Sequence, residues 1–267
     1  MKVTGFLSAA ALAIAMLPQS VLAADAAAPS TEPSTEMSAA QKTEIQKVVH
    51  DYLLSNPEVL LEASQALQQK QQQAMQQQAQ SAIKENAQEL FADKFTIIGN
   101  PKGKVTLVEF FDYQCRHCKD MSPVMAELVK SDSNLRIIYK EFPIFGETSE
   151  MASKAALAAG MQGKYKAMHE ALITQKTPLD EKIITASAQG VGLDMAKFKT
   201  DMASKQVTET LAANRKLAEK LKLMGTPAFI VASTPEGMFK EGSEIAFVPG
   251  AASREALQEM IKKASAS

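Results

Sequence analysis

The residues best suited to covalent chemistry are Cys115 and Cys118, the two cysteines of the 267-residue chain. Because they lie three positions apart, a disulfide between them would close a very short loop. The stabilisation that a disulfide provides grows with the loop that it closes, so a purely structural bridge here would contribute little. The spacing is instead typical of a redox-active disulfide that exchanges bonds with other thiols.

A zinc site is the main chemical alternative, since zinc ligands use the same cysteine spacing. Zinc requires about four ligands, and such sites usually contain a second cysteine pair. The three histidines are His50, His117 and His169, and they are widely separated along the chain. We therefore expect no metal, and no cofactor besides the Cys115–Cys118 disulfide itself.

The sequence around Cys115 predicts an activated sulfur at the start of a helix. Residues 104–112, KVTLVEFFD, are β-branched and aromatic and predict a buried strand, and a helical pattern follows Cys118. Unpaired N–H groups and the dipole at the start of a helix favour a thiolate, so we expect a low pKa for Cys115. His117 can add a donor or a positive charge to the same sulfur, and Arg116 raises the local potential. The alternative for His117 is an ordinary exposed position.

A stabilised thiolate has a consequence for the direction of exchange. It favours the reduced pair, and so makes the disulfide a stronger oxidant. In the expected reaction, a substrate thiolate attacks the sulfur of Cys115, while Cys118, set deeper on the helix, is released and later re-forms the bond. Cys115 is therefore predicted to be the sulfur that meets substrate proteins.

The segments that position the pair alternate between strand and helix patterns. Residues 135–140 predict a second strand after the cysteine helix. Two further strands are predicted at 228–231 and 245–248, ahead of a closing helix over 253–263.

A long helical stretch separates the second strand from the third. Residues 147–223 show helical periodicity and many alanines, with breaks at Gly160, Pro178 and the pair Gly190 and Gly192. This pattern predicts a bundle of about four helices.

Residues 1–23 are laid out as a secretory signal peptide. Lys2 precedes an apolar stretch over 6–17, and small or aliphatic residues lead to a predicted cut after Ala23. A membrane anchor is the alternative, but the apolar run is shorter than the roughly 20 residues that cross a bilayer. Residues 24–40, rich in Ala, Ser, Thr and Pro, predict a flexible leader. We therefore expect the mature protein in the periplasm, where disulfides persist.

Residues 41–94 predict a helical arm. One helix ends at Asn56 and Pro57, and a second carries apolar residues at seven-residue steps through a Gln-rich stretch. The apolar positions are Ile45, Val48, Val49, Tyr52 and Leu53 in the first helix and Leu60, Leu67 and Ala74 in the second. Such an arm cannot bury this face alone, so we expect a homo-oligomer paired through it, a dimer rather than a trimer. A solvated spacer and a helix folded back on its own domain are the alternatives.

From Phe95 to the C-terminus, the order strand, CxxC at a helix start, strand, helical block, strand, strand, helix resembles the DsbA family. The sequence GTPA at 225–228 is similar to the family's loop with a cis-proline, and VPGA at 248–251 is similar to the turn before its last helix. The arm, with DYLL at 51–54 and NPEVL at 56–60, resembles that of oligomeric DsbA-like proteins.

This resemblance implies an α/β fold. Residues 95–146 and 224–267 would form a thioredoxin fold, and residues 147–223 would form an inserted α-helical domain. The N-terminal helical oligomerisation arm, 41–94, would precede them.

The resemblance also implies roles for residues outside the CxxC motif. It implies a cis Thr226–Pro227 bond opposite Cys115, with the preceding backbone free to pair with a bound peptide and Thr226 in contact with the sulfur. Threonine here, where the best-known oxidases of the family carry valine, is similar to the disulfide isomerases. Glu109 and Lys140 match a buried acid and its lysine partner, which either tune the cysteines and relay a proton or form a structural ion pair.

Together these features predict a periplasmic thiol:disulfide oxidoreductase, an oxidase with isomerase capability, that acts on exported proteins with cysteines. The resemblance implies a membrane redox partner of the DsbB or DsbD type. A reduced-state isomerase is the alternative among enzymes. A non-enzymatic periplasmic chaperone or surface protein, using the Gln-rich arm and the Met-rich helices, is the alternative outside that class. A formal net charge of −1 gives no indication of nucleic-acid binding.

Overall fold

The computed structural model of the chain describes residues 37–93 and 95–266, and its internal contacts divide the chain into two units, Met1–Glu62 and Ala63–Ser267. The expected signal peptide, residues 1–23, and the leader up to residue 36 lie outside the described residues. None of the helices in the described ranges is long and apolar enough to span a bilayer.

The first unit contains helix α1 (Ala39–Ser55) and the first turn of helix α2 (Glu58–Glu85). α1 begins at a capping box, in which the Ser38 side chain accepts from the Gln41 N–H and the Gln41 side chain accepts from the Ser38 N–H. Its C-terminal end is capped by Asn56, whose side chain and N–H both donate to a carbonyl one turn earlier. The two helices and the break between them were predicted from the sequence.

Large apolar side chains are exposed along α1 and α2. In the first unit they are Met37, Ile45, Val48, Val49, Tyr52, Leu54, Leu60 and Leu61, and in the second unit Leu67 and Met75. No residue of α1 is buried. Within each unit, the described residues therefore leave these apolar side chains open to solvent.

The second unit is built around a five-stranded sheet with the order β1-β3-β2-β4-β5. Its strands are β1 (Ile97–Gly99), β2 (Val105–Phe111), β3 (Leu135–Glu141), β4 (Ala228–Ser233) and β5 (Ile245–Pro249). β2 and β3 are parallel, and the other neighbouring pairs are antiparallel. β2, β3 and β4 are buried along their whole length, as their apolar runs predicted. β1, three residues long, was not predicted.

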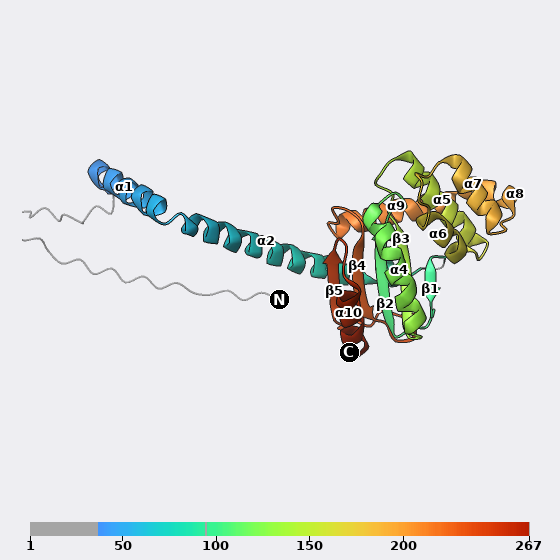
Figure 1. The fold of residues 1–267 in the computed structure, drawn as a ribbon. Helices are drawn as coiled ribbons and strands as arrows, with labels where there is room; N and C mark the ends of the chain where they lie inside the picture. Colours follow the sequence, from blue (N-terminus) through green and yellow to red (C-terminus); the bar gives the residue numbers. More distant parts are fainter. Residues whose placement is uncertain (1–36, 94, 267) are drawn as a thin grey trace, which may run out of the picture. The chain divides into compact units, whose positions relative to one another are not determined.

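Helices cover both faces of the sheet (Figure 1). α4 (Arg116–Ser131) and α10 (Arg254–Ala266) pack on one face, and α3 (Ala87–Phe91) packs on the other with the end of α2. Ile83, near the end of α2, is fully buried in this second core, so the last part of the predicted arm packs against the sheet. A short 3-10 helix, Pro235–Gly237, connects β4 to β5.

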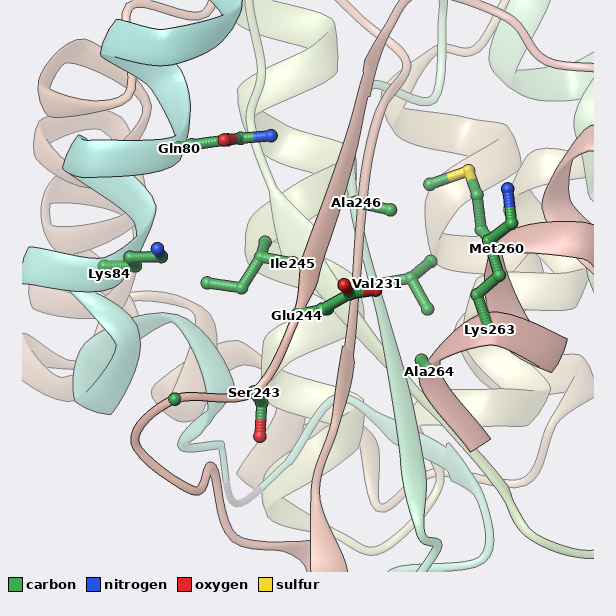
Figure 2. A pocket seen from close by; sticks show the side chains of 11 residues that line it. Gln80, Lys84, Val231, Ser243, Glu244, Ile245, Ala246, Met260, Lys263 and Ala264 are labelled. Atoms are coloured by element: carbon green, nitrogen blue, oxygen red, sulfur yellow. The ribbon is translucent and has the colours of Figure 1, made fainter. Parts of the chain in front are cut away.

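Figure 2 shows the two layers at the sheet edge formed by β5. Gln80 and Lys84 of α2 lie on one side of the strand, and Met260 and Lys263 of α10 lie on the other. Ile245 of β5 points toward α2 and is buried there. Because side chains alternate along a strand, β5 contributes apolar residues to the cores on both faces of the sheet.

The inserted segment between β3 and β4 contains five helices, rather than the predicted four or so. They are α5 (Glu147–Met161), α6 (Tyr165–Ile173), α7 (Glu181–Gly190), α8 (Met195–Met202) and α9 (Lys205–Lys220). α8 is a separate helix because the chain turns at Gly192, with φ +74°, and Asp194 then caps a new start by accepting from the Lys197 N–H.

The break predicted at Gly160 is found one residue later, since α5 ends at Met161 and α6 begins at Tyr165. Gly160 itself is the last but one residue of α5, where an added Cβ would come within 3.0 Å of the Cβ of Phe95. The glycine therefore permits close packing between α5 and the segment that leads into β1. The expected α/β architecture, a thioredoxin-like fold with inserted helices behind N-terminal helices, is confirmed.

Candidate active site

Cys115 is the N-cap residue of α4, at the end of the loop that follows β2. Its N–H donates to the Asp112 carbonyl over 3.1 Å, which forms the turn into the helix. Cys115 and Cys118 are both buried, with 4% and 2% of their surface exposed, and they are not bonded to each other. The chain thus holds both sulfurs on the first turn of one helix.

The pKa values of the two thiols are shifted in opposite directions. The Cys118 thiol donates to the Cys115 sulfur, and this bond is the main reason that the pKa of Cys115 falls to about 5, in spite of burial. The N–H groups of Cys118 and His117 and the Thr226 hydroxyl also favour the thiolate. The pKa of Cys118 is raised far above its ordinary value, chiefly by the same bond and by burial. Cys115 can therefore be ionised at neutral pH while Cys118 keeps its proton.

The side chains of His117 and Arg116 are exposed. His117 acts on Cys115 through its backbone N–H, and in the described structure no hydrogen bond joins its ring to the sulfur. Arg116 Nε lies 3.8 Å from the exposed Asp120 carboxylate. The backbone of the helix start favours the thiolate, and the expected contribution of the two side chains stays a prediction.

The Thr226–Pro227 bond is cis and lies beside Cys115. Cys115 Sγ lies 3.3 Å from the Thr226 carbonyl oxygen, which accepts a hydrogen bond from the thiol when Cys115 is protonated. The Thr226 hydroxyl is buried and makes no well-formed hydrogen bond within the described residues, yet it is near enough to favour the thiolate. The Gly250 N–H donates to the Pro227 carbonyl over 2.9 Å, which joins the two loops that carried the family resemblance.

Glu109 lies on β2, on the sheet face that carries α4. It is 2% exposed, and the described residues provide its carboxylate with neither an ion pair nor a hydrogen bond. Burial, together with the negative charge of Cys115, raises its pKa well above the ordinary value. Glu109 is therefore a buried acid that keeps its proton close to the two sulfurs.

The expected pairing of Glu109 with Lys140 is wrong. In the parallel register, Tyr139 is the residue opposite Glu109, and Lys140 is opposite Phe110. Since side chains alternate along a strand, Lys140 points to the other face of the sheet. There its Nζ lies 3.4 Å from the Asp93 carboxylate. The same Nζ donates to the carbonyls of residues 89 and 92 at the end of α3. Lys140 holds α3 and does not belong to the site.

Asp112 is a buried residue of the site that the sequence analysis did not single out. Its carboxylate accepts from the Gln114 N–H and the Ser149 hydroxyl, both at 2.7 Å, and from two consecutive N–H groups that begin at Ile144. It thereby ties the loop before Cys115 to the segment after β3. The available signal was an aspartate placed directly after a strand and three residues before the cysteine.

Two further buried polar residues, Tyr113 and Glu141, were also missed. The Tyr113 hydroxyl donates to the Glu141 carboxylate over 3.0 Å. Their separation of 28 residues in sequence offers no local pattern by which to connect them.

An apolar groove of about 740 Å³ lies beside the Thr226–Pro227 loop. Met75 and Ala79 of α2 form one wall, and Leu223 and Met224 lie ahead of the loop. Met224 is 97% exposed, which is unusual for a large apolar side chain.

Among residues 37–93 and 95–266, no cluster of three or more His, Cys, Asp or Glu side chains is arranged to hold a metal ion.

Two family models match the chain. Residues 106–262 match the DSBA-like thioredoxin domain, and residues 41–74 match the N-terminal domain of the copper resistance protein ScsC.

Solved structures of similar proteins extend these matches. A thioredoxin-like oxidoreductase from Silicibacter pomeroyi DSS-3 is 39% identical, with 68% of this chain and 99% of that chain covered and a TM-score of 0.61. BcfH from Salmonella enterica Typhimurium is 31% identical, with 85% and 96% covered and a TM-score of 0.73. A periplasmic thioredoxin-like protein from Salmonella enterica serovar Typhimurium is 27% identical, with 69% and 97% covered and a TM-score of 0.57.

Among curated proteins, the thiol:disulfide interchange protein DsbA of Bordetella parapertussis is 29% identical over 135 residues, 48% of this chain and 64% of that protein. The Na(+)/H(+) antiporter NhaA 1 of Salinispora arenicola is 28% identical over 141 residues, 52% of this chain. That match spans 22% of the antiporter's own length.

Proposed function

The chain belongs to the family of DSBA-like thioredoxin domains, and on that premise we propose that it is a periplasmic thiol:disulfide oxidoreductase that exchanges disulfides with exported proteins. One observation carries this proposal. Cys115 has a pKa of about 5 at the start of α4, while Cys118, one turn on, holds its proton. A sulfur that is ionised at neutral pH beside one that is protonated is suited to forming and then resolving a mixed disulfide.

The exchange proceeds in two displacements. A substrate thiolate attacks Cys115 Sγ of the oxidised protein, the Cys115–Cys118 bond breaks, and Cys118 leaves with the electron pair. A second substrate thiolate then attacks the substrate sulfur of the mixed disulfide, and Cys115 leaves as a thiolate. The substrate gains a disulfide and loses two electrons, which the protein keeps as a dithiol.

Glu109 supplies the proton that this reaction needs inside the core. The leaving Cys118 sulfur requires a proton, because its raised pKa makes the buried anion unfavourable. Glu109, protonated on the same sheet face, donates this proton and then regains one from solvent, so that it is protonated again in the dithiol form.

The Thr226–Pro227 loop and the adjacent groove receive the substrate chain. The backbone before Pro227 pairs with an extended peptide, which brings the substrate sulfur toward Cys115. The apolar side chains of Met75 and Met224 offer flexible contacts to unfolded segments.

The protein acts as an oxidase with isomerase capability. The low pKa of Cys115 supports the oxidase, because a stabilised thiolate makes the disulfide more oxidising. Threonine at position 226, by the family resemblance, supports the isomerase, and a membrane partner of the DsbB or DsbD type would set the balance. Trapping the redox state of the pair in cells with an alkylating mass tag tests this direction. A fully oxidised pool indicates an oxidase alone, a fully reduced pool an isomerase alone, and a mixture the dual role.

The arm joins copies of the chain into a homo-oligomer, a dimer rather than a trimer. The exposed apolar side chains of α1 and α2 and the match of residues 41–74 to the ScsC N-terminal domain support this assembly. In this arrangement residues 41–94 are the arm, 95–146 with 224–267 the thioredoxin fold, and 147–223 the insert. Light scattering of the mature protein tests it, and a monomer at tens of micromolar would contradict it.

Export of the chain by residues 1–23 and residence in the periplasm are supported by the leader pattern and by the periplasmic thioredoxin-like relative. Fractionation of cells, with the N-terminus of the mature protein determined by mass spectrometry, tests both.

The activity itself is tested with Cys118→Ala, which cannot resolve mixed disulfides. Cells that express this variant should accumulate disulfide-linked adducts between Cys115 and exported proteins, and the double variant with Cys115→Ala should accumulate none. Cys115→Ala should also abolish catalysed insulin reduction and ribonuclease refolding. Full activity of Cys115→Ala in preventing client aggregation, without any adducts of Cys118→Ala, would instead indicate the non-enzymatic chaperone.

A further inference from the structure

Glu141 is the point at which the active-site loop meets the inserted helices. It is the last residue of β3 and is fully buried. Its Oε1 accepts from the Tyr113 hydroxyl over 3.0 Å and from the Tyr165 hydroxyl over 2.8 Å, and its carbonyl accepts from the Asn214 side chain over 3.1 Å. Tyr113 lies two residues before Cys115, Tyr165 begins α6, and Asn214 lies in α9. One residue therefore connects the cysteine loop to two helices of the insert.

The carboxyl group of Glu141 has no cation to balance its charge. No ion pair within residues 37–93 and 95–266 involves it. Its Oε2 and the Ser153 hydroxyl of α5 are both buried without a well-formed hydrogen bond, although Ser153 lies near enough to favour the anion. The charge of Asp112 opposes ionisation. A buried carboxyl with three hydroxyl neighbours and no cation is poised between its neutral and charged forms.

The remaining titratable neighbours stay in one state across the ordinary pH range. His169 of α6 lies 3.2 Å from the Tyr113 hydroxyl, and burial lowers its pKa to about 3, so its ring is neutral. Tyr139 of β3 packs against this ring, with 4.2 Å between the ring centroids, and burial raises its pKa well above the ordinary value. Tyr113 and Tyr165 are shifted in the same direction for the same reason. Glu141 is therefore the group of this cluster that titrates.

We propose that Glu141 is a positioning residue for disulfide exchange, which acts on Cys115 through Tyr113 and makes the reactivity of Cys115 depend on the protonation of one buried carboxyl. This inference rests on the proposed function. Hydrogen bonds to a carboxylate are roughly twice as strong as those to a neutral acceptor. The ionised form therefore holds Tyr113, and the loop that leads to Cys115, more firmly than the neutral form does.

The two titrations are well separated on the pH scale. Burial raises the pKa of Glu141 to about 8, against the opposing effects of Tyr165, Ser153 and Tyr113. The pKa of Cys115 is about 5. A change at Glu141 therefore occurs when Cys115 is already fully ionised, and it can be observed separately.

The test is the rate at which iodoacetamide alkylates Cys115 of the reduced, full-length protein between pH 4 and pH 10, with the modified residue identified by mass spectrometry. Cys118 does not compete, since its pKa lies far above this range. For the wild type we expect the alkylation rate to rise once near pH 5, where Cys115 ionises. We expect a second rise, of about two- to fivefold, near pH 8, where Glu141 ionises. A flat rate above pH 6 in the wild type would overturn the proposal.

Three variants separate positioning from packing. Glu141→Gln keeps a neutral acceptor at every pH, and Tyr113→Phe cuts the link to the loop, so both should show the step near pH 5 alone. Tyr165→Phe is the matched control, because it removes the other hydroxyl and leaves the link to Tyr113. It should retain the second step, moved to higher pH by the loss of one donor to the anion.

The outcomes also separate this inference from the proposed function. A second step that persists in Tyr113→Phe would overturn the role of Glu141 while leaving Cys115 an active nucleophile. Should Glu141→Gln fail to fold, the comparison of Tyr113→Phe with Tyr165→Phe still decides the matter. A Cys115 that fails to react below pH 8 in the wild type would contradict the proposed function itself.

Discussion

The sulfur of Cys115 lies 3.3 Å from the carbonyl oxygen of Thr226, the residue that precedes the cis-proline Pro227. The two residues are 111 positions apart in the sequence, and the antiparallel pairing of β2 with β4 brings them together. The thiol proposed to meet the substrate and the backbone proposed to receive it therefore form one structural unit, and a substitution at either residue should change its chemistry.

Thr226→Val should raise the pKa of Cys115. The hydroxyl favours the thiolate without a well-formed hydrogen bond, so the pKa should rise by less than the roughly one unit, about 1.5 kcal/mol, that a hydrogen bond to a charged group contributes. Thiolate absorbance at 240 nm, followed against pH, measures the shift. Thr226→Ser keeps the hydroxyl and should leave the pKa near 5, whereas a shift in Thr226→Ser and none in Thr226→Val would show that the methyl group matters instead.

The reduced protein should lose stability as the pH falls toward 5. The folded pKa of Cys115, about 5, lies below that of a free thiol, so the unfolded chain binds more protons between these values. This contribution is present above the unfolded pKa and is lost as the pH falls through about 5. Urea unfolding of the reduced wild type and of Cys115→Ser, compared from pH 4 to pH 9, measures it. Parallel stability curves would contradict the assignment.

Glu141 should give the opposite slope in the oxidised protein, in which Cys115 no longer titrates. Its folded pKa, about 8, lies above its ordinary value, so the folded state binds more protons and stability falls as the pH rises between about 4.5 and 8. Glu141→Gln should flatten this part of the curve. The measurement is urea unfolding without reductant, and an unchanged slope in the variant would assign the effect to another group.

Glu109→Gln should slow the opening of the disulfide. Glutamine cannot donate a proton to the departing Cys118, and a positioned acid contributes about a hundredfold to such a step. Stopped-flow reduction of the oxidised protein by dithiothreitol across pH measures the rate. An unchanged pH profile would leave Glu109 with a structural role only.

Lys140→Met should destabilise the protein by about 3 kcal/mol, because the nearly buried Asp93 carboxylate loses its partner. The pKa of Cys115 should stay near 5, since Lys140 faces away from the site. Chemical unfolding and the 240 nm titration measure the two quantities. Adding Asp93→Asn should recover part of the stability. A shift of the Cys115 pKa in Lys140→Met would restore the ion pair with Glu109 that the sequence suggested.

Much of the fold could be predicted because its signals are local. The apolar runs over β2, β3 and β4 predicted buried strands, since a strand covered on both faces has no polar side to show. The break between α1 and α2 at Asn56 was equally visible. β1 was not predicted because three residues carry too little pattern. α8 was not predicted as a separate helix because its start depends on a turn and an N-cap residue.

The error at Lys140 shows where local reasoning fails. A shift of one residue along a strand moves a side chain to the opposite face, and no pattern within β3 reveals which residue of β2 it pairs with. The hydrogen bonds that join Glu141 to Tyr113 and Tyr165 escaped for a related reason, because they connect residues 28 and 24 positions apart.

The sequence alone determined the chemistry: two cysteines three residues apart after a strand, a threonine and proline before another strand, and an arm with an unpaired apolar face. These are properties of neighbouring residues, and local propensity and spacing suffice to identify them. The tertiary structure decided which groups surround the sulfurs: Thr226 beside Cys115, Glu109 on the same face without a partner, and Lys140 on the other face. That outcome depends on register and packing between distant segments, which are set by the folded chain as a whole and not by any stretch of it.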